Sequence, residues 1–172
     1  MISIFLIFHM ALPLIISEIP YIKNNFKINR LSLLIGSIFP DLIDKPLSIM
    51  EISSGRGFSH SLFFVFIYFL VLLALTKGDK SISVPFFIGC LFHLALDMPS
   101  IPLFYPFVYY DFSILKDPIG HWWIILLTNP IIQATELIGA AIFIFIIWNN
   151  KLFSFRDIIN YIKTNSIHSN KD

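Results

Sequence analysis

Cysteine and charge are both scarce in this sequence, and each shortage excludes a class of protein. Cys90 is the one cysteine among 172 residues, so the chain can form neither an intramolecular disulfide nor a thiolate zinc cluster. Only 13% of the residues are charged and 56% are hydrophobic, whereas soluble domains are about 25% charged. A net charge of +1 leaves no basic footprint, and no nucleic-acid partner is expected. Together with a mean hydropathy of +0.79, this composition predicts an integral membrane protein.

Three common catalytic motifs are missing as well. The sequence has no Gly-rich phosphate loop, no nucleophile elbow and no His-Glu-x-x-His helix. Any metal ligands must therefore come from histidine, aspartate and glutamate. No repeat or flexible linker divides the chain. We expect one membrane helix bundle carrying the site over residues 1–150, followed by a cytoplasmic, partly amphipathic tail over residues 151–172.

The apolar runs predict an all-α, polytopic membrane bundle of about four or five transmembrane or half-spanning helices. Residues 2–16 form the first run. Residues 31–39 form a short second run that Pro40 is expected to stop, because the residue before proline disfavours helix. Residues 58–76 are expected to be the clearest spanning helix, with Ser59 as its N-cap.

The second half of the sequence contains two further apolar segments. A helix that begins near Pro85 is expected to end at Asp97, and Asn129-Pro130 is expected to start a helix over residues 131–148. Between them, residues 100–117 are rich in proline and aromatics and predict an ordered interfacial loop, which residues 120–127 continue.

Basic residues accumulate on the cytoplasmic side of membrane proteins, which makes orientation testable from the sequence. If the N-terminus faces out, most basic residues fall inside, and the candidate site residues gather near the outer surface. We therefore expect a multi-pass protein of the inner or plasma membrane with its site near the extracytoplasmic surface. The residues expected inside are Lys23, Lys27, Arg30, Lys77, Lys80, Lys151, Arg156, Lys163 and Lys171, and those expected outside are Lys45, Arg56 and Lys116.

Ionisable residues inside apolar segments are functional by default, and they occur here at metal-ligand spacing. His93 and Asp97 stand four apart, which places both on one face of a helix, although an apolar helix can also carry such a pair by chance. Asp41 and Asp44 either bind a cation or form a turn in which Asp44 caps a helix. His60 is either a ligand or an interfacial imidazole, with neighbouring serines able to orient it.

Further polar residues are candidates for catalysis. His9 is a ligand or, as a lone histidine, a packing residue. Glu136 lies about two turns inside the last apolar helix and, like Asp44, is a candidate to orient or deprotonate a nucleophilic water. Arg56 and Lys45 are candidates to neutralise a phosphate group.

The donor set suits a divalent cation with oxygen and nitrogen ligands. Zinc fits best, and manganese and iron(II) remain alternatives. The candidates outnumber the four ligands of a tetrahedral zinc, which indicates either two ions or one ion with outer partners. Two ions about 3.5–4 Å apart are suited to phosphoester hydrolysis by an activated water.

In order, the pattern is an early His9, then Gly36-Ser-x-x-Pro-Asp41-x-x-Asp, then His60-Ser, then Gly89-x-x-x-His-x-x-x-Asp97. It resembles the membrane-bound metal-dependent hydrolase family, also described as LexA-regulated, inner-membrane-associated hydrolases. The resemblance covers residues 9–106. It implies a helical membrane protein distantly similar to zinc-dependent phospholipase C. The metal ligands that it implies by position are His9, Asp41, Asp44, His60, His93 and Asp97.

Three functions remain open at this point. The first is a membrane-embedded metal-dependent hydrolase that cleaves a phosphoester of a membrane lipid headgroup or a similar amphiphile, with Asp44, Glu136 and Arg56 as catalytic residues. The second is a small metal or proton transporter, whose site would lie at the bilayer midplane within inverted repeats, and no such repeat is seen. The third is a membrane scaffold with a structural metal site.

Overall fold

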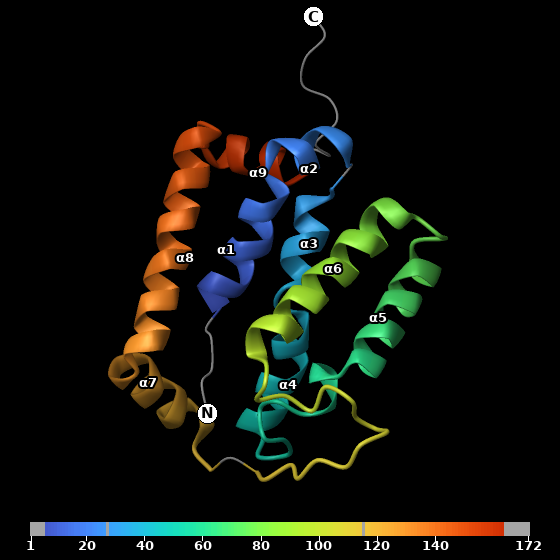
Figure 1. The fold of residues 1–172 in the computed structure, drawn as a ribbon, viewed down its shortest axis with the longest axis vertical. Helices are drawn as coiled ribbons and strands as arrows, with labels where there is room; N and C mark the ends of the chain where they lie inside the picture. Colours follow the sequence, from blue (N-terminus) through green and yellow to red (C-terminus); the bar gives the residue numbers. More distant parts are fainter. Residues whose placement is uncertain (1–5, 27, 115, 164–172) are drawn as a thin grey trace, which may run out of the picture.

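Every regular element is a helix in the computed structural model, which describes residues 6–26, 28–114 and 116–163 (Figure 1). The all-α bundle expected from the sequence is confirmed. The elements in order are α1 (Leu6–Ser17), α2 (Pro20–Asn25), α3 (Arg30–Gly36), α4 (Phe39–Ile49), the 3-10 turn η1 (Phe58–His60), α5 (Leu62–Leu75), α6 (Lys80–Asp97), α7 (Pro118–Thr128), α8 (Pro130–Asn149) and α9 (Phe155–Lys163).

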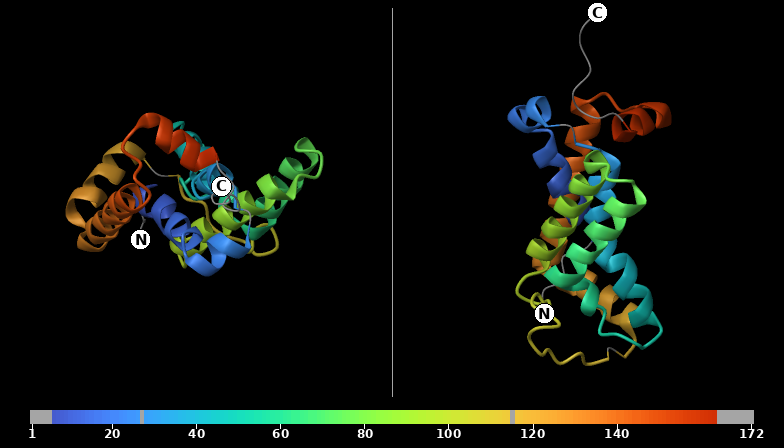
Figure 2. Two further views of the ribbon diagram at one scale, coloured as in Figure 1. Left: turned by 90° about the horizontal axis from the view of Figure 1, so that it is seen from above. Right: turned by 90° about the vertical axis from the view of Figure 1, so that its right-hand side faces the viewer.

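Helices α1 and α3 form the middle of the bundle. Helix α8 packs along α1, α6 packs along α3, and α5 packs on the far side of α6. Figure 2 shows α8 and the α5–α6 pair on opposite flanks of this centre. The elements α2, α9 and the α5–α6 turn lie at one end of the bundle, and α4, η1, α7 and the loop after α6 lie at the other (Figure 1). The N-terminal half of the chain therefore places α4 and η1 beside the last turn of α6.

Two glycines allow α3 and α6 to touch backbone to backbone. A Cβ on Gly36 would lie 2.1 Å from the carbonyl oxygen of Phe86, and one on Gly89 would lie 2.3 Å from that of Leu33. Small residues permit this close crossing of helices, as they do in membrane proteins generally. The crossing holds the C-terminal half of α6 against the end of α3.

The expected spanning helix over residues 58–76 is shorter than predicted. Helix α5 begins at Leu62 and is 14 residues long, and its N-cap is Ser61, whose hydroxyl accepts from the Phe64 N–H. Ser59 does not cap, because its hydroxyl contacts Asp44 and the Pro40 carbonyl, so residues 58–60 form a separate turn. A tertiary contact has thus replaced the local cap that the sequence favoured.

Proline placement accounts for two further differences. Pro40 does not end the second apolar run: α3 already ends at Gly36, and Pro40 lies in the first turn of α4, where its missing N–H is not needed. Residues 120–127 do not continue the loop, because Pro118 starts α7 and Asp117 caps it through the Gly120 N–H. The expected start at Asn129-Pro130 is confirmed, with the Asn129 side chain accepting from two N–H groups of α8.

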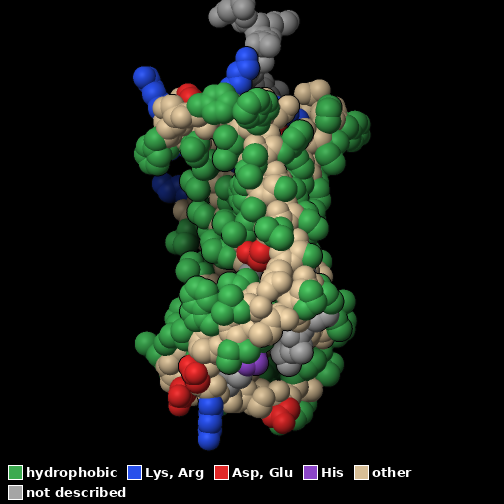
Figure 3. Space-filling view, turned by 90° about the vertical axis from the view of Figure 1, so that its left-hand side faces the viewer, with side chains coloured by type: hydrophobic (Ala, Val, Ile, Leu, Met, Phe, Trp, Pro, Cys, Tyr) green, Lys and Arg blue, Asp and Glu red, His purple; other side chains and the backbone are tan. Residues whose placement is uncertain are grey.

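Two helices, α6 with 18 residues and α8 with 20, are long and apolar enough to cross a membrane by length and composition. Helices α1, α5 and α7 are shorter apolar helices. On the face that contains α8, hydrophobic side chains dominate the middle, and Lys and Arg side chains stand toward the ends (Figure 3).

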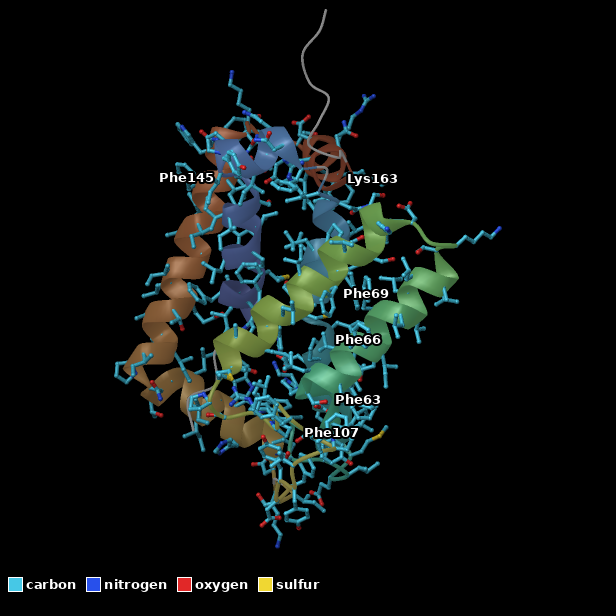
Figure 4. All side chains as sticks on the ribbon, turned by 45° about the vertical axis from the view of Figure 1, so that its right-hand side comes forward. Phe63, Phe66, Phe69, Phe107, Phe145 and Lys163 are labelled. Atoms are coloured by element: carbon cyan, nitrogen blue, oxygen red, sulfur yellow. The ribbon has the colours of Figure 1, made fainter. Side chains whose placement is uncertain are left out.

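Phenylalanines cover much of the outer side of α5. Phe63, Phe66 and Phe69 project from this helix, and Phe107, from the loop after α6, lies at its lower end (Figure 4). The rings of Phe63 and Phe107 pack edge to face with centroids 5.5 Å apart. The proline- and aromatic-rich loop is thereby anchored beside η1, and a hydrogen bond from the Leu62 N–H to the Leu103 carbonyl reinforces the anchor.

A polar network ties the opposite end together. Glu18 accepts from the Arg30 guanidinium, from Lys23 and from the Tyr161 hydroxyl, and the Arg30 guanidinium also lies over the Tyr161 ring. The network joins the end of α1 to α2, α3 and α9. The tail helix expected within residues 151–172 is therefore packed onto the bundle. Lys27, Lys171 and residues 164–172 lie outside the described residues.

Candidate metal centre

Four of the expected ligands meet at one point. Asp41 comes from the first turn of α4, His60 from η1, and His93 and Asp97 from the last two turns of α6. One ligand atom from each residue lies within 4.8 Å of the other three. The four residues are buried, none more than 7% exposed. The i, i+4 pair read from the sequence does share one face of α6, since its Nε2 and Oδ2 atoms are 3.7 Å apart.

The spacing of these atoms fits a small cation. The two Nε2 atoms of His60 and His93 are 3.1 Å apart, and Asp41 Oδ1 lies 3.4 Å from the first and 3.8 Å from the second. Asp97 Oδ2 lies 3.7 Å from each. A tetrahedral zinc with bonds of about 2.0–2.1 Å has ligand atoms about 3.3–3.4 Å apart. The cluster therefore already has nearly the dimensions of a tetrahedral shell.

The histidines are held so that their Nε2 atoms face each other. His93 Nδ1 donates to the Ser37 carbonyl at 2.8 Å, and because a carbonyl only accepts, the neutral ring has an unprotonated Nε2. His60 Nδ1 lies 2.7 Å from Asp44 Oδ2, an equivalent arrangement. Two lone pairs 3.1 Å apart repel each other unless a proton or a metal ion lies between them. Nδ1 partners of this kind are typical of metal-bound histidines.

Asp44 stands behind His60 at the edge of the cluster. Its Oδ2 also accepts from the Gly57 N–H at 2.7 Å and from the Ser59 hydroxyl, while its Oδ1 has no hydrogen-bond partner among the described residues. Gly57 allows the backbone to come this close, because a Cβ there would lie 3.1 Å from Asp44 Oδ1. This position makes Asp44 the partner that orients a ligand, rather than one of the four clustered residues.

The two clustered carboxylates each divide their oxygens. Asp97 turns Oδ2 to the histidines and Oδ1 to Arg56 Nη2 at 2.8 Å. Asp41 turns Oδ1 to the histidines and Oδ2 to Lys45 one helical turn on. Lys45 and Arg56 thus fix which carboxylate oxygen faces the cluster. Both side chains also lie beside any group that binds at the cluster.

Charge at the centre favours a cation. Asp41, Asp44 and Asp97 face Lys45 and Arg56, so with neutral imidazoles one negative charge remains uncompensated in a buried site. An unbalanced buried charge is costly. Burial alone would raise the pKa of Asp41, but its hydrogen bond with His60 and the charge of Lys45 hold that pKa below its usual range. This carboxyl is therefore ionised at neutral pH.

His9 lies beside the four clustered residues. It is fully buried in α1, its Nε2 is 3.6 Å from Asp97 Oδ1, and its ring packs on that of His93 with centroids 4.4 Å apart. It therefore lies on the side of Asp97 that faces away from His60. A ligand role for His9 remains a prediction, and it belongs to the alternative with a second ion.

Glu136, expected to be catalytic, contacts the start of α1. Its carboxylate accepts from the backbone N–H groups of Ile7 at 3.3 Å and Phe8 at 3.1 Å, at the start of α1. A carboxylate is favourable there because the first N–H groups of a helix lack partners. Glu136 thus fixes the end of the helix that carries His9, and its catalytic role remains a prediction.

Two contacts of the centre were not expected from the sequence. The Ser37 carbonyl accepts from His93, which is 56 residues away in the sequence. Every residue has a backbone carbonyl, so the residue type at position 37 could not indicate this contact. Ser59 binds Asp44 instead of capping a helix. The neighbouring Ser-His pair was the available clue, since a hydroxyl beside a candidate ligand indicates an orienting role.

Comparisons with known proteins address the family alone. No curated protein and no solved structure matches this chain. A family model described as YdjM inner membrane protein matches residues 6–156, which include all the residues of the metal centre. Because that match covers most of the 172 residues, the chain belongs to the YdjM inner membrane protein family.

Proposed function

We propose that this protein is a membrane-embedded, metal-dependent phosphoester hydrolase. The observation that carries the proposal is the buried convergence of two imidazoles and two carboxylates, with the Nε2 atoms of His60 and His93 only 3.1 Å apart. Arg56 and Lys45 flank the cluster, so cations stand where the charge of a phosphate needs neutralising.

The position of each residue indicates its role in the proposed activity. Asp41, His60, His93 and Asp97 hold the ion, with zinc the best fit to the donor set and manganese or iron(II) as alternatives. Asp44 and the Ser37 carbonyl orient the two imidazoles. A bound divalent cation supplies Lewis acidity and lowers the pKa of water. Arg56 Nη2 lies 2.8 Å from Asp97 Oδ1, which places the charge of a guanidinium beside the cluster, where it can neutralise a phosphate.

A substrate at the membrane surface suits the surroundings of the centre. The chain belongs to an inner-membrane family, and the loop after α6 exposes Phe107 at 80% and Tyr109 at 89% near the metal-centre end. Aromatic side chains favour the headgroup level of a bilayer. We therefore infer that the substrate is a phosphoester on a lipid headgroup or another amphiphile.

The first test is metal content together with turnover. The detergent-purified protein is expected to hold at least one zinc-like ion per chain and, when loaded, to hydrolyse bis(p-nitrophenyl) phosphate or a phospholipid headgroup ester. Asp41→Asn should lose both metal and turnover. The matched control is Asp79→Asn, which changes the same group at the exposed start of α6, where Asn also caps a helix well.

The outcomes separate the alternatives. Metal retained by Asp41→Asn, or none in the wild type, would overturn the assignment. A loaded protein without turnover favours the structural scaffold, which the burial of all four ligands also supports. The transporter is less favoured, because Asp41 is in the first turn of α4 and Asp97 is the last residue of α6, so the cluster lies at helix ends.

A further inference from the structure

A large, mostly apolar groove lies beside α6, outside the metal centre. It has a volume of about 580 Å³ and lies among α1, α2, α3 and α6, toward the end that carries α2 and α9. Its walls are mostly apolar, with Pro13 from α1, Phe26 from the segment after α2, and Val84, Ile88 and Phe92 from α6. None of the four clustered ligands lines it.

The groove has the length of one bilayer leaflet. Along α6 its lining runs from Lys80 to Phe92, twelve residues further on. At a helical rise of about 1.5 Å per residue, this distance is roughly 18 Å. The hydrocarbon core of a bilayer is about 30 Å thick, so one leaflet is about 15 Å deep. An acyl chain laid along α6 would therefore occupy the groove with its headgroup at one end.

That end is basic. Lys80 and Ser81, in the first turn of α6, line the groove at this end, and no carboxylate lines the groove among the described residues. Asp79 precedes Lys80 but uses Oδ1 to accept from the Ser81 N–H as the cap of α6. The remaining lining is apolar apart from Ser17, whose hydroxyl already donates to the Leu14 carbonyl. A single phosphate is the group that this charge pattern complements.

We propose that this groove binds one anionic glycerophospholipid of the surrounding membrane, with an acyl chain along α6 and the phosphate at Lys80. The proposal goes beyond the proposed hydrolase activity, because none of the four clustered ligands lines the groove and Lys80 lies at the opposite end of α6 from Asp97. The lipid serves as a bound component that fills the space between α1 and α6, and it is not the substrate.

A second groove provides a matched control. It has a volume of about 330 Å³, lies among α3, α4, α5 and α6, and is lined by residues such as Phe39, Val71 and Phe86. It carries no charged residue. If apolar shape alone retained lipid, both grooves would behave alike. If the charge of Lys80 selects the lipid, the larger groove alone should prefer an anionic headgroup.

The test is native mass spectrometry of the full-length protein released from micelles that contain phosphatidylglycerol or phosphatidylcholine. The wild type is expected to retain one phosphatidylglycerol per chain and to retain phosphatidylcholine at least fivefold less. Lys80→Gln should remove this preference, and Val84→Phe should remove retention of both lipids. Lys116→Gln and Val71→Phe, which make the same changes elsewhere, should behave as the wild type. Helical content by circular dichroism and bound metal should be equal in all variants.

Three results would overturn the proposal. If the wild type and Lys80→Gln each retained phosphatidylglycerol and phosphatidylcholine equally, Lys80 would not select the headgroup. Loss of retention in Val71→Phe but not in Val84→Phe would place the lipid in the other groove. A lipid-free wild-type dimer that Val84→Phe converts to monomer would show that a second copy of the chain covers the groove. Because metal binding and turnover are measured separately, failure of this proposal is distinguishable from failure of the proposed hydrolase.

Discussion

Asp41 and Asp44 stand three residues apart on α4 yet face different partners. Asp41 points an oxygen at the Nε2 atoms, whereas Asp44 holds the opposite nitrogen of His60. In the proposed metal centre, Asp41 is therefore a ligand and Asp44 orients His60, although both residues are aspartates. The difference depends on the 2.7 Å contact of Asp44 with His60 Nδ1 and on the N–H of Gly57.

Asp44→Asn tests the orienting role. The amide keeps the size of the side chain but removes the charge that sets the His60 tautomer. We expect metal affinity to fall by about 10–100-fold, as for other partners of metal-bound histidines, with the chain still folded. Competition with a fluorescent chelator measures the affinity. Unchanged affinity would contradict the orienting role, and complete loss equal to that of Asp41→Asn would indicate that Asp44 itself is a ligand.

At the scale of elements, the crossing of α3 and α6 decides whether the centre forms. Gly89 contacts α3 directly, and four residues later His93 reaches the carbonyl of Ser37 just past the end of the same helix. The fixed crossing brings His93 to its acceptor. A change that separates the helices should therefore disturb the metal site as well as stability.

Gly89→Ala is the corresponding prediction. The added methyl would lie 2.3 Å from the Leu33 carbonyl oxygen and 2.7 Å from the Ser37 nitrogen, so α3 and α6 must move apart. Overpacking of this kind costs about 1–3 kcal/mol, and bound metal per chain should fall with it. Thermal unfolding and metal analysis measure the two effects. Ala95→Ser adds one atom on the exposed side of α6 and should leave both unchanged.

The contacts of Glu18 hold the tail helix α9 against the bundle. Burial alone would raise the pKa of Glu18, but its hydrogen bonds from Lys23 and Tyr161 and the charge of Arg30 lower it below 4.5. A group whose pKa is lowered by folding contributes stability above its unfolded pKa and loses it as the pH falls through the folded value. The stabilisation is therefore complete at neutral pH and disappears in acid below about pH 4.5.

Glu18→Gln should accordingly destabilise the protein at neutral pH by about 1–3 kcal/mol, since it weakens hydrogen bonds to a charged group. The difference from the wild type should shrink as the pH falls through the folded-state pKa of Glu18, which lies below 4.5. Thermal unfolding across this pH range measures it. Glu51→Gln, at an exposed carboxylate, is the control and should show no such pH-dependent difference. A constant difference at every pH would contradict the linkage.

For the whole molecule, the distribution of basic residues predicts which end faces the cytoplasm. The end with α2, α9 and the α5–α6 turn contains Lys23, Lys77 and Lys80, whereas the end with the metal centre contains Lys45 and Arg56. Basic residues favour the cytoplasmic side. We expect the metal centre near the extracytoplasmic surface.

Cysteine labelling tests this orientation, because the native Cys90 is fully buried. In right-side-out vesicles, a membrane-impermeant maleimide should label Asp111→Cys, in the loop near the metal centre, at once. Lys77→Cys, in the α5–α6 turn, should be labelled only after detergent is added. The reverse pattern would invert the topology and place the proposed hydrolytic site inside the cell.

The sequence by itself determined the class of the protein and most of the candidate centre. Its apolar runs predicted an all-α bundle, and four of its predicted ligands, His60, His93, Asp41 and Asp97, are the residues that converge. These predictions succeed because burying an ionisable group in an apolar segment is costly, so residue type alone marks the position. The helix start at Asn129-Pro130 was predicted for a different reason, which is that capping depends on neighbouring residues.

Only the tertiary structure decided what each polar group faces. Asp44 contacts His60, and Ser59 contacts Asp44 instead of capping a helix. Glu136 accepts from the start of α1, and the Ser37 carbonyl accepts from His93. These partners are separated by 15 to 128 residues in the sequence. Local propensity says nothing about such contacts, because the crossing of α3 with α6 and the packing of α8 on α1 set the distances between them.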